Sequence, residues 1–547
     1  MSTLIQNPIL RGFNPDPSIV RVGDDYYIAT STFEWYPGVQ IHHSRDLVHW
    51  RLLTRPLNRS SQLNMLGDPD SCGIWAPCLT YADGLFYLIY TDVKRYGRTT
   101  QAGSAGASLR DMHNYLVTCE TIDGEWSDPI YLNGSGFDPS LFHDDDGRKY
   151  LLNMLWDYRP GHNRFAGIQL QEYSHPEQKL IGPRQIIFKG TPIGLTEGPH
   201  LYKRDGYYYL LTAEGGTGWG HAVTLARSTN LTGPYELHPD TYILTARDRP
   251  DAELQRAGHA DLVETQNGEI YMVHLCGRPL RNRGRCTLGR ETAIQKMKWN
   301  GAGWLVTDDG DPVPRIEVPS PDFPEHEVPA APTREDFDSA ELAIDFQWLR
   351  SPWPNELFSL TDRPGHLRLF GRESLGSFFR QGLVARRQQS HCYSAVTSID
   401  FQPEDFQQQA GLICYYNSAK FHYLYISHDE TIGKHLRVMS SSPDQVQTDA
   451  FTAPIPIAAA GPIELRVEID YERLRFTFRI NDEAWTWLPE VFDASILSDE
   501  ATAPGQPNFT GAFVGMCCQD SSGLGRPADF DYFEYIERDY QPNIEGL

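Results

Sequence analysis

The sequence predicts an all-β protein: a five-bladed β-propeller in residues 1–318, a linker in 319–333 and a β-sandwich in 334–547. Three observations support this prediction. A hairpin pattern repeats about every 61 residues in the first part, and apolar and polar residues alternate strictly in the last part. In addition, 38 prolines and 46 glycines are spread along the chain, which is typical of many short strands joined by turns.

The repeat is a β-like run, a turn rich in Asp, Gly or Asn, and an aromatic or branched run, which together indicate a hairpin. Its five copies begin at intervals of 60, 62, 60 and 61 residues. Each interval has room for four short strands, as in a propeller blade, whereas solenoid repeats are generally shorter and more uniform. The copies are DPSIVRVGDDYYIAT from Asp16, APCLTYADGLFYLIYT from Ala76, DPSLFHDDDGRKYLLNM from Asp138, GPHLYKRDGYYYLLTAE from Gly198 and HADLVETQNGEIYMVHL from His259.

The second half of the chain begins after a proline-rich, acidic stretch that is typical of an interdomain linker. In this second half, the segment IELRVEIDYERLRFTFRI (463–480) alternates apolar and polar residues on both sides of a turn. Strict period two predicts an antiparallel hairpin with one buried face. The remaining length, about 210 residues, is sufficient for a β-sandwich.

Composition excludes several classes of function. The formal net charge of −24 argues against a nucleic-acid partner, which needs clustered Lys and Arg. No segment reaches the roughly 18 apolar residues of a membrane span, and MSTLIQNPILRGF does not resemble a leader peptide. Nine cysteines, an odd number without any CxxC pair, fit free thiols in a reducing compartment. We therefore expect a cytoplasmic protein without a membrane partner.

The propeller arrangement predicts where the chemically active residues meet. The innermost strand of every blade starts at the same end of the channel, so equivalent positions of the copies converge on one opening. Those positions hold Asp16, Asp138, His259 and Gly198, which Glu197 precedes. Taken singly, each Asp of the two Asp-Pro-Ser turns could be a turn former, and the histidine could be a hydrogen-bonded core residue. Their recurrence at channel positions favours a site.

Two carboxyl groups that face each other across a pocket suggest glycoside hydrolysis, in which one is the acid and the other the base or nucleophile. A third carboxylate nearby would raise the pKa of the acid. Aromatic residues near the same strand ends, among them Phe33, Trp75 and Trp219, could face a sugar or belong to the core. Arg290 could hold sugar hydroxyls or a carboxylate, or lie on the surface.

Several of these stretches resemble the β-xylosidases of glycoside hydrolase family 43. They are NPILRGFNPDPSIVRVGDDYYIATSTFEWYPGVQIHHSRDLVHW, GFDPSLFHDDDGRKYLLNMLWD, LTEGPHLY and LGRETAIQK. The resemblance extends over nearly the whole chain and implies a five-bladed propeller followed by a jelly-roll, concanavalin-like sandwich. It also implies an inverting, exo-acting enzyme that releases terminal D-xylose from β-1,4-xylo-oligosaccharides, with side activity on arabinofuranosides.

The resemblance implies a role for each candidate residue. Asp16 would be the general base, Glu197 the general acid and Asp138 the residue that tunes the acid's pKa and helps to position the sugar. Substrate-binding residues would be Phe33, Trp75, Thr217, His259, Arg290 and, from the sandwich, Phe509 in PGQPNFTGAFVGM, which would close the pocket. No metal ligand is assigned and no cofactor is required, although some relatives hold a Ca²⁺ near the channel histidine, here His259.

The sequence leaves some questions open. An α-L-arabinofuranosidase on the same scaffold and a non-catalytic sugar-binding propeller are the alternative functions. The segment 94–111, KRYGRTTQAGSAGASLRD, is longer than the family pattern and could reshape the outer subsite. A homo-oligomer, either a dimer or a tetramer, is a further expectation that the sequence does not decide.

Overall fold

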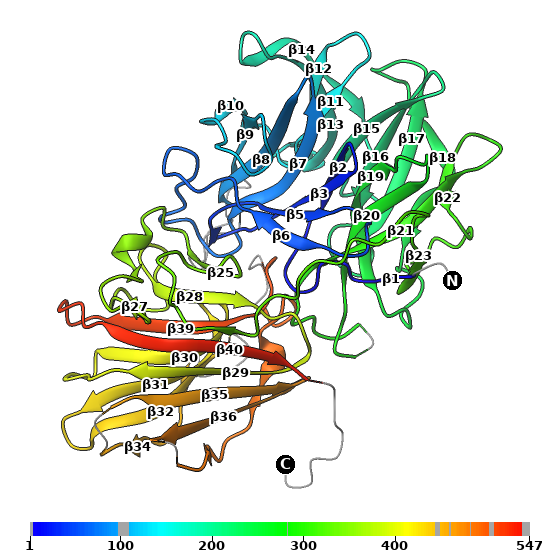
Figure 1. Ribbon diagram of the computed structural model, residues 1–547. Coiled ribbons are helices and arrows are strands. Elements are labelled where there is room, and N and C mark those ends of the chain that lie inside the picture. The colour runs from blue at the N-terminus through cyan, green and yellow to red at the C-terminus, as the bar shows by residue number, and fades with distance from the viewer. Residues whose placement is uncertain are drawn as a thin grey trace. The chain divides into compact units, whose positions relative to one another are not determined.

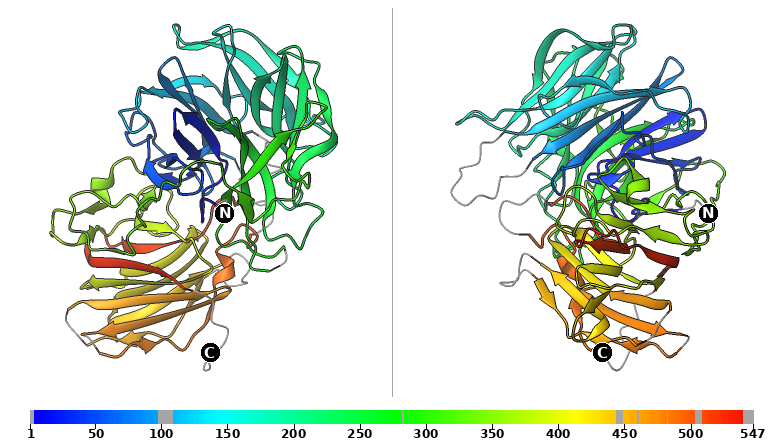
Figure 2. Two further views of the ribbon diagram at one scale, coloured as in Figure 1. Left: turned by 45° about the vertical axis from the view of Figure 1, so that its right-hand side comes forward. Right: turned by 90° about the vertical axis from the view of Figure 1, so that its left-hand side faces the viewer.

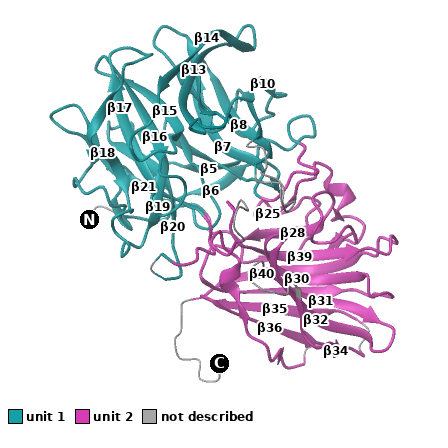
Figure 3. Ribbon diagram, turned by 180° about the vertical axis from the view of Figure 1, so that it is seen from behind, with its two compact units in different colours: residues 1–63, 71–283, 290–328 teal, residues 64–70, 284–289, 329–547 magenta. Residues whose placement is uncertain are grey.

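The computed structural model separates into two compact units (Figure 3). Unit 1 comprises residues 1–63, 71–283 and 290–328, and unit 2 comprises 64–70, 284–289 and 329–547. The structure describes residues 4–96, 109–281, 283–442, 449–458, 461–481, 483–502 and 508–538.

Two short segments of the first part of the chain therefore belong to unit 2. In the first, the Met65 and Gly67 amides donate to the Arg350 carbonyl at 3.3 Å and the Phe378 carbonyl at 2.7 Å. In the second, the Thr287 carbonyl accepts from the Ala512 amide at 2.9 Å. No repeat or composition change marks these segments, because they are loops between strands whose partners lie hundreds of residues away. The main division, between residues 328 and 329, falls inside the predicted linker.

Unit 1 is a five-bladed propeller, as the sequence predicts. Its five antiparallel sheets each consist of four strands, which follow one another in sequence order and around a common centre (Figures 1 and 2). The innermost strands β2, β7, β11, β15 and β19 contact one another in a closed ring. Blade 1 contains β2 (Ser18–Val22), β3 (Asp25–Thr30), β5 (Gln40–Ser44) and β6 (Arg51–Thr54). Blade 2 contains β7 (Gly73–Ala82), β8 (Leu85–Arg95), β9 (Asp111–Cys119) and β10 (Ile130–Asn133). Blade 3 contains β11 (Ser140–His143), β12 (Lys149–Trp156), β13 (Phe165–Ser174) and β14 (Lys179–Phe188). Blade 4 contains β15 (Glu197–Arg204), β16 (Tyr207–Glu214), β17 (Ala222–Ser228) and β18 (Glu236–Thr245). Blade 5 contains β19 (Gln255–Glu264), β20 (Ile270–Gly277), β21 (Glu291–Trp299) and β22 (Leu305–Thr307).

The N-terminal segment runs along blade 5. Strand β1 (Leu4–Gln6) pairs antiparallel with β23 (Glu317–Pro319), and Leu10 forms a bridge with Thr292 of β21. Because Asp16 follows directly, this pairing fixes the chain on which that carboxylate lies. Strand β4 (Trp35–Tyr36) lies between β3 and β5 in the chain.

Unit 2 is built on two antiparallel sheets and matches the predicted sandwich. The predicted hairpin is β35 (Ile463–Asp470) and β36 (Arg473–Ile480). The apolar residues of β35 are buried and the polar residues between them are partly exposed, because one face of the strand packs into the core. Among the described residues, the only helices are two 3₁₀ turns, η1 (Pro354–Glu356) and η2 (Ala494–Ile496). The prediction of an all-β protein is thus confirmed.

The strand order of the first sheet is β26-β27-β40-β29-β35-β36-β37, and β24 also pairs with β40 and β38 with β36. The strand order of the second sheet is β33-β32-β31-β30-β39-β28-β25, and β34 also pairs with β32. The first contains β24 (Arg334–Glu335), β26 (Phe358–Ser359), β27 (Leu367–Leu369), β29 (Cys392–Asp400), β35 (Ile463–Asp470), β36 (Arg473–Ile480), β37 (Thr486–Trp487), β38 (Phe492–Asp493) and β40 (Ala528–Glu537). The second contains β25 (Phe346–Leu349), β28 (Gly382–Arg387), β30 (Gln408–Asn417), β31 (Lys420–Asp429), β32 (Gly433–Ser441), β33 (Asp449–Phe451), β34 (Ile455–Pro456) and β39 (Phe513–Asp520).

All nine cysteines are free and buried. None of the helices in the described part of the chain has the length and apolar character needed to cross a bilayer.

Candidate active site

The five equivalent positions of the repeat share an unusual backbone conformation. Asp16, Ala76, Asp138, Gly198 and His259 have φ values of 56°, 34°, 54°, 56° and 43°. This left-handed region costs energy for any residue except glycine, and non-glycine residues that occupy it tend to cluster at functional sites. The same conformation recurs within a few residues of the start of all five inner strands, so the same local backbone geometry directs the side chains at these positions.

Asp16 is buried and held by two side chains. Its Oδ1 accepts from Arg290 Nη1 at 2.9 Å, and its Oδ2 accepts from the Ser31 hydroxyl at 2.7 Å. The Ser31 hydroxyl in turn accepts from the Ala76 amide at 2.7 Å, which ties blade 1 to blade 2. The Asn14 amide donates to the Arg290 carbonyl at 2.9 Å. Both oxygens of the carboxylate are therefore fixed from more than one blade.

Asp138 and Glu197 lie beside this group on blades 3 and 4. The Gly198 amide donates to Asp138 Oδ2 at 3.1 Å, so the residue after Glu197 is bonded to the neighbouring carboxyl. His259 Nδ1 lies 3.6 Å from Asp16 Oδ1 and 4.0 Å from Asp138 Oδ2. The structure thus brings together four residues that lie far apart in the sequence.

The loop that leads to Glu197 is fixed by another buried carboxylate, Glu214 at the end of β16. Glu214 Oε1 accepts from the Thr191 amide at 2.9 Å and from the Thr196 hydroxyl at 3.1 Å. Gly190, with a φ of 88°, passes so close that an added Cβ would lie 2.0 Å from the Thr196 hydroxyl oxygen. The approach of the chain to Glu197 is therefore tightly defined.

Burial and neighbouring charges shift the pKa values of these groups in different directions. Burial, followed by the negative charge of Asp16, raises the pKa of Glu197 to about 8. Burial and the charges of Glu197 and Asp16 raise the pKa of Asp138 well above its usual range. Burial lowers the pKa of His259 to about 4, so this imidazole is neutral near pH 7. The site can therefore hold a protonated carboxyl group close to an ion-paired carboxylate at neutral pH.

Aromatic rings line the same strand ends. The Phe33 ring lies 5.4 Å from the Trp75 ring and the Arg290 guanidinium 5.2 Å above Phe33. Phe137, the residue before Asp138, lies 5.6 Å from Trp75. The predicted residues Phe33, Trp75 and Arg290 thus lie in one cluster that adjoins Asp16 and Asp138.

The other predicted residues are less closely tied to this cluster. Thr217 is half-buried in the loop between β16 and β17, and Trp219 in the same loop lies under the guanidinium of Arg256, 4.8 Å away. Phe509 is half-buried and belongs to unit 2, so its role stays a prediction. Most of the long segment 94–111, residues 97–108, lies outside the described residues.

Sequence reasoning did not single out three further residues. Ser31 is one of them. Its role depends on a contact between two blades, which no local sequence pattern predicts. The others are Tyr96 and Arg110, which flank residues 97–108. Tyr96 lies 4.8 Å from Trp75, and the Arg110 guanidinium lies 4.5 Å from Tyr96. Burial and then the charge of Glu197 raise the pKa of Tyr96 to about 12. The extra length of this loop was their only signal.

The described residues form no protein cluster for a metal ion around His259. In the parts of the chain that the structure describes, no group of three or more His, Cys, Asp or Glu side chains is arranged to hold one. Ca²⁺ in particular prefers six to eight oxygen ligands, whereas the two carboxylates nearest His259 Nδ1, those of Asp16 and Asp138, already accept from Arg290 and from the Gly198 amide. We derive no step that involves a metal.

Comparison with known proteins places these features in a family. The model of the Glycosyl hydrolases family 43 matches residues 5–305, and that of the Beta xylosidase C-terminal Concanavalin A-like domain matches 334–536. The chain is 51% identical to the Beta-xylosidase of Bacillus subtilis (strain 168), covering 98% of this chain and 100% of the relative. It is 52% identical to the Xylosidase/arabinosidase 43B of Humicola insolens, covering 97% of both.

Among solved structures, the chain is similar to the xylan beta-1,4-xylosidase from Bacillus halodurans C-125. The TM-score is 0.93 at 55% identity, over 97% of this chain and 100% of that chain. The likeness therefore includes both units and the sequence that forms the site.

Proposed function

Because the chain belongs to glycosyl hydrolase family 43, we propose that it is an inverting, exo-acting β-xylosidase. It releases terminal D-xylose from β-1,4-xylo-oligosaccharides. The observation that carries the proposal is the difference between two neighbouring carboxyl groups. Asp16 is ion-paired with Arg290, whereas the pKa of Glu197 is about 8, which is the pairing of a base with an acid that inversion requires.

Asp16 acts as the general base in this mechanism. Its carboxylate, oriented by Arg290 and Ser31, takes a proton from a water molecule while the oxygen of that water forms a bond to the anomeric carbon. Glu197 is protonated near pH 7 and gives its proton to the glycosidic oxygen as the bond to the leaving group breaks. After the products leave, exchange with solvent returns the two groups to their starting states.

Asp138 and the lining residues support these two groups. We propose that Asp138 tunes the pKa of the acid and helps to position the sugar. Burial and the charges of Glu197 and Asp16 raise the pKa of Asp138 as well, so Asp138 and Glu197 oppose each other's ionisation. The bond to the Gly198 amide keeps Asp138 next to the acid. We propose that Phe33, Trp75 and Thr217 shape the sugar subsites and that His259 and Arg290 hold hydroxyls of the terminal xylose. Phe509 of unit 2 is proposed to close the pocket, so that one terminal sugar is removed at a time.

An α-L-arabinofuranosidase is the second candidate. The name of the Humicola insolens relative contains both activities, and the same acid and base would serve either sugar. Parallel measurement of kcat/KM with 4-nitrophenyl β-xylopyranoside and α-L-arabinofuranoside separates the two. A higher value for the arabinoside would make the arabinofuranosidase the better description of the enzyme.

Three further expectations remain proposals. The nine buried free thiols support a reducing, cytoplasmic location. A dimer or tetramer would appear as a multiple of 62.1 kDa in light scattering. A Ca²⁺ near His259 would make turnover fall after treatment with a chelator and recover with added Ca²⁺, whereas catalysis by the carboxylates predicts no change.

The stereochemical outcome is the main test. Proton NMR of xylobiose hydrolysis should show α-xylose as the first-formed anomer, followed by mutarotation. Replacement of Asp16 or Glu197 by Ala should slow turnover by about 10²–10⁴-fold. If β-xylose forms first, the mechanism is retaining, and if the wild-type protein turns over neither glycoside, the sugar-binding alternative is correct.

A further inference from the structure

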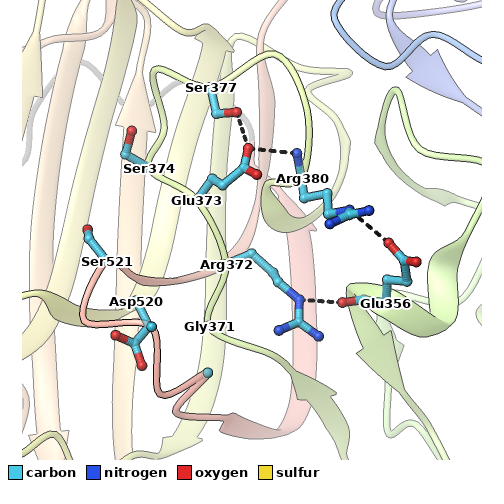
Figure 4. Close-up of a pocket in the computed structure, with 11 residues that line it drawn as sticks. Glu356, Gly371, Arg372, Glu373, Ser374, Ser377, Arg380, Asp520 and Ser521 are labelled. Atoms are coloured by element: carbon cyan, nitrogen blue, oxygen red, sulfur yellow. Dashed lines mark hydrogen bonds and ion pairs between the residues drawn. The ribbon is translucent and has the colours of Figure 1, made fainter.

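Unit 2 contains a polar hollow of about 870 Å³ that belongs entirely to this unit. It lies between the loop 371–380, which follows β27, and the loop 521–527, which joins β39 to β40 (Figure 4). Its lining residues are Glu356, Gly371, Arg372, Glu373, Ser374, Ser377, Arg380, Asp520, Ser521, Gly523 and Gly525. The lining therefore contains charged side chains, hydroxyls and glycines, and no aromatic ring.

The backbone of both walls is fixed. The Asp520 amide donates to the Arg372 carbonyl at 2.8 Å, and the Gly371 amide donates to the Arg526 carbonyl at 3.1 Å. Gly371 has no room for a side chain, because an added Cβ would lie 2.6 Å from Asp520 Cβ. The hollow is thus a formed feature of the sandwich, and the two loops are held to each other at its floor.

Arg372 offers unused donors to this space. Its Nε donates to the Glu356 carbonyl at 2.5 Å, and its guanidinium lies 5.3 Å from the Phe370 ring. The Arg372 side chain makes no other hydrogen bond or ion pair within the described residues, and in Figure 4 both terminal nitrogens lack a dashed line. An added Cβ on Gly525 would lie 3.6 Å from Nη1, so this glycine keeps the approach to the guanidinium open.

The carboxylates around the hollow are already engaged with protein groups. Glu356 pairs with Arg380 Nε at 2.8 Å. Glu373 accepts from the Arg380 amide at 3.1 Å and from the Ser377 hydroxyl. Asp520 accepts from the Ser522 amide and hydroxyl and from the Arg526 amide at 2.8 Å. Each carboxylate therefore already has a hydrogen-bond or ion-pair partner in the protein, whereas the terminal nitrogens of Arg372 have hydrogen-bonding capacity left.

These observations define the chemistry of the ligand. The planar fork of an arginine matches a carboxylate through two parallel hydrogen bonds. Ser374 and Ser521 lie on the walls, and their hydroxyls make no hydrogen bond to another described residue, so they can bond to the hydroxyls of a sugar. A volume of about 870 Å³ is in the range of small-molecule sites. A neutral sugar would have no aromatic face to stack on.

We propose that this hollow binds an acidic sugar, that is, a saccharide that carries a carboxylate group. Arg372 holds the carboxylate, and Ser374 and Ser521 contact the ring hydroxyls. The overall charge of −24 opposes anion binding at long range, but salt screens charges beyond about 10 Å, so the local donors decide. The proposal goes beyond the hydrolysis of xylosides and does not depend on it.

The test measures binding to the full-length protein by titration calorimetry at about 150 mM NaCl, where charges more than about 8 Å away are screened. The probes are D-glucuronate, D-glucose, acetate and inorganic phosphate. We expect saturable binding of glucuronate, with acetate, phosphate and glucose at least about tenfold weaker. Binding of glucuronate that is not saturable, or acetate or phosphate that binds as tightly, would overturn the proposal.

Variants locate the site. Arg372→Gln should weaken glucuronate binding by at least about tenfold, and Arg372→Lys, which keeps the charge but loses the fork, by a few-fold. Arg45→Gln, an exposed residue of unit 1, is the matched control and should bind as the wild type does. Undiminished binding by Arg372→Gln would place the ligand elsewhere.

A second variant tests the hollow independently, in case Arg372→Gln does not fold. In the double variant Ser374→Ala with Ser521→Ala, the arginine is intact and only the hydroxyls are lost. Glucuronate binding should fall about three- to tenfold, while acetate binding, the thermal midpoint and turnover of the aryl xyloside stay as in the wild type. Equal glucuronate binding by this variant would show that the hollow does not recognise the sugar.

Discussion

The pKa of Glu197 predicts how activity depends on pH. Burial and the charge of Asp16 raise this pKa from 4.5 to about 8, which corresponds to about 5 kcal/mol of penalty on the ionised form at 1.36 kcal/mol per unit. With a pKa of about 8, roughly nine-tenths of the protein carries the proton at pH 7 and roughly one-tenth at pH 9. At the ordinary value, less than about one-hundredth would carry it at pH 7.

The assay is the pH profile of kcat/KM for xylobiose between pH 5.5 and 9.5. Activity should fall about tenfold from pH 7 to pH 9, along a basic limb with a midpoint near 8. Glu197→Gln cannot donate a proton, so its rate should be about 10²–10⁴-fold lower and its basic limb should disappear. With 4-nitrophenyl β-xylopyranoside, whose leaving group needs little protonation, the loss in this variant should be smaller.

Two results would refute this reasoning. A basic limb below about pH 6 would mean that the acid is not held protonated by burial and like charge. A basic limb that persists unchanged in Glu197→Gln would mean that another group, rather than Glu197, loses the proton that limits turnover.

Three further predictions use matched pairs of variants or pH values. Ser31→Ala, which removes a 2.7 Å bond to the base, should lower kcat about tenfold at similar KM. Ser18→Ala removes a comparable bond, to the Asp261 carboxylate at 2.8 Å, and should change only the thermal midpoint. Equal losses of kcat in the two variants would contradict this. Gly198→Ala and Gly206→Ala both place a side chain at positive φ, at 56° and 78°, so each should lower the free energy of unfolding by about 1–2 kcal/mol. Only the added Cβ of Gly198→Ala would crowd His259, at 3.0 Å from its Cδ2, so only this variant should reduce kcat. The pKa of Glu197 is higher in the folded than in the unfolded state, so the wild type loses stability as pH rises from about 4.5 to 8. Glu197→Gln should therefore have the same melting temperature as the wild type near pH 4 and a higher one at pH 8. A difference in melting temperature that shrinks as pH rises would contradict this prediction.

The propeller could be predicted because its information is local. Each hairpin is defined by a run, a turn such as GDD after Val22, and a second run, and the spacing of about 61 residues shows that this unit is repeated. The alternation in 463–480 likewise fixes a strand pair by its period. Convergence of Asp16, Asp138 and His259 then follows from the geometry of a propeller.

The tertiary structure decided the features that depend on contacts between distant residues. Arg290 bonds to Asp16 across 274 positions, Ser31 joins two blades, and residues 64–70 and 284–289 leave the repeat to join the sandwich. The raised pKa of Glu197 likewise comes from burial and from a charge on another blade. The sequence by itself determined the strands, their period and the positions that face the channel, since these follow from patterns a few residues long. The pairing and protonation of the side chains depend on distances in space, and no local pattern in the chain specifies them.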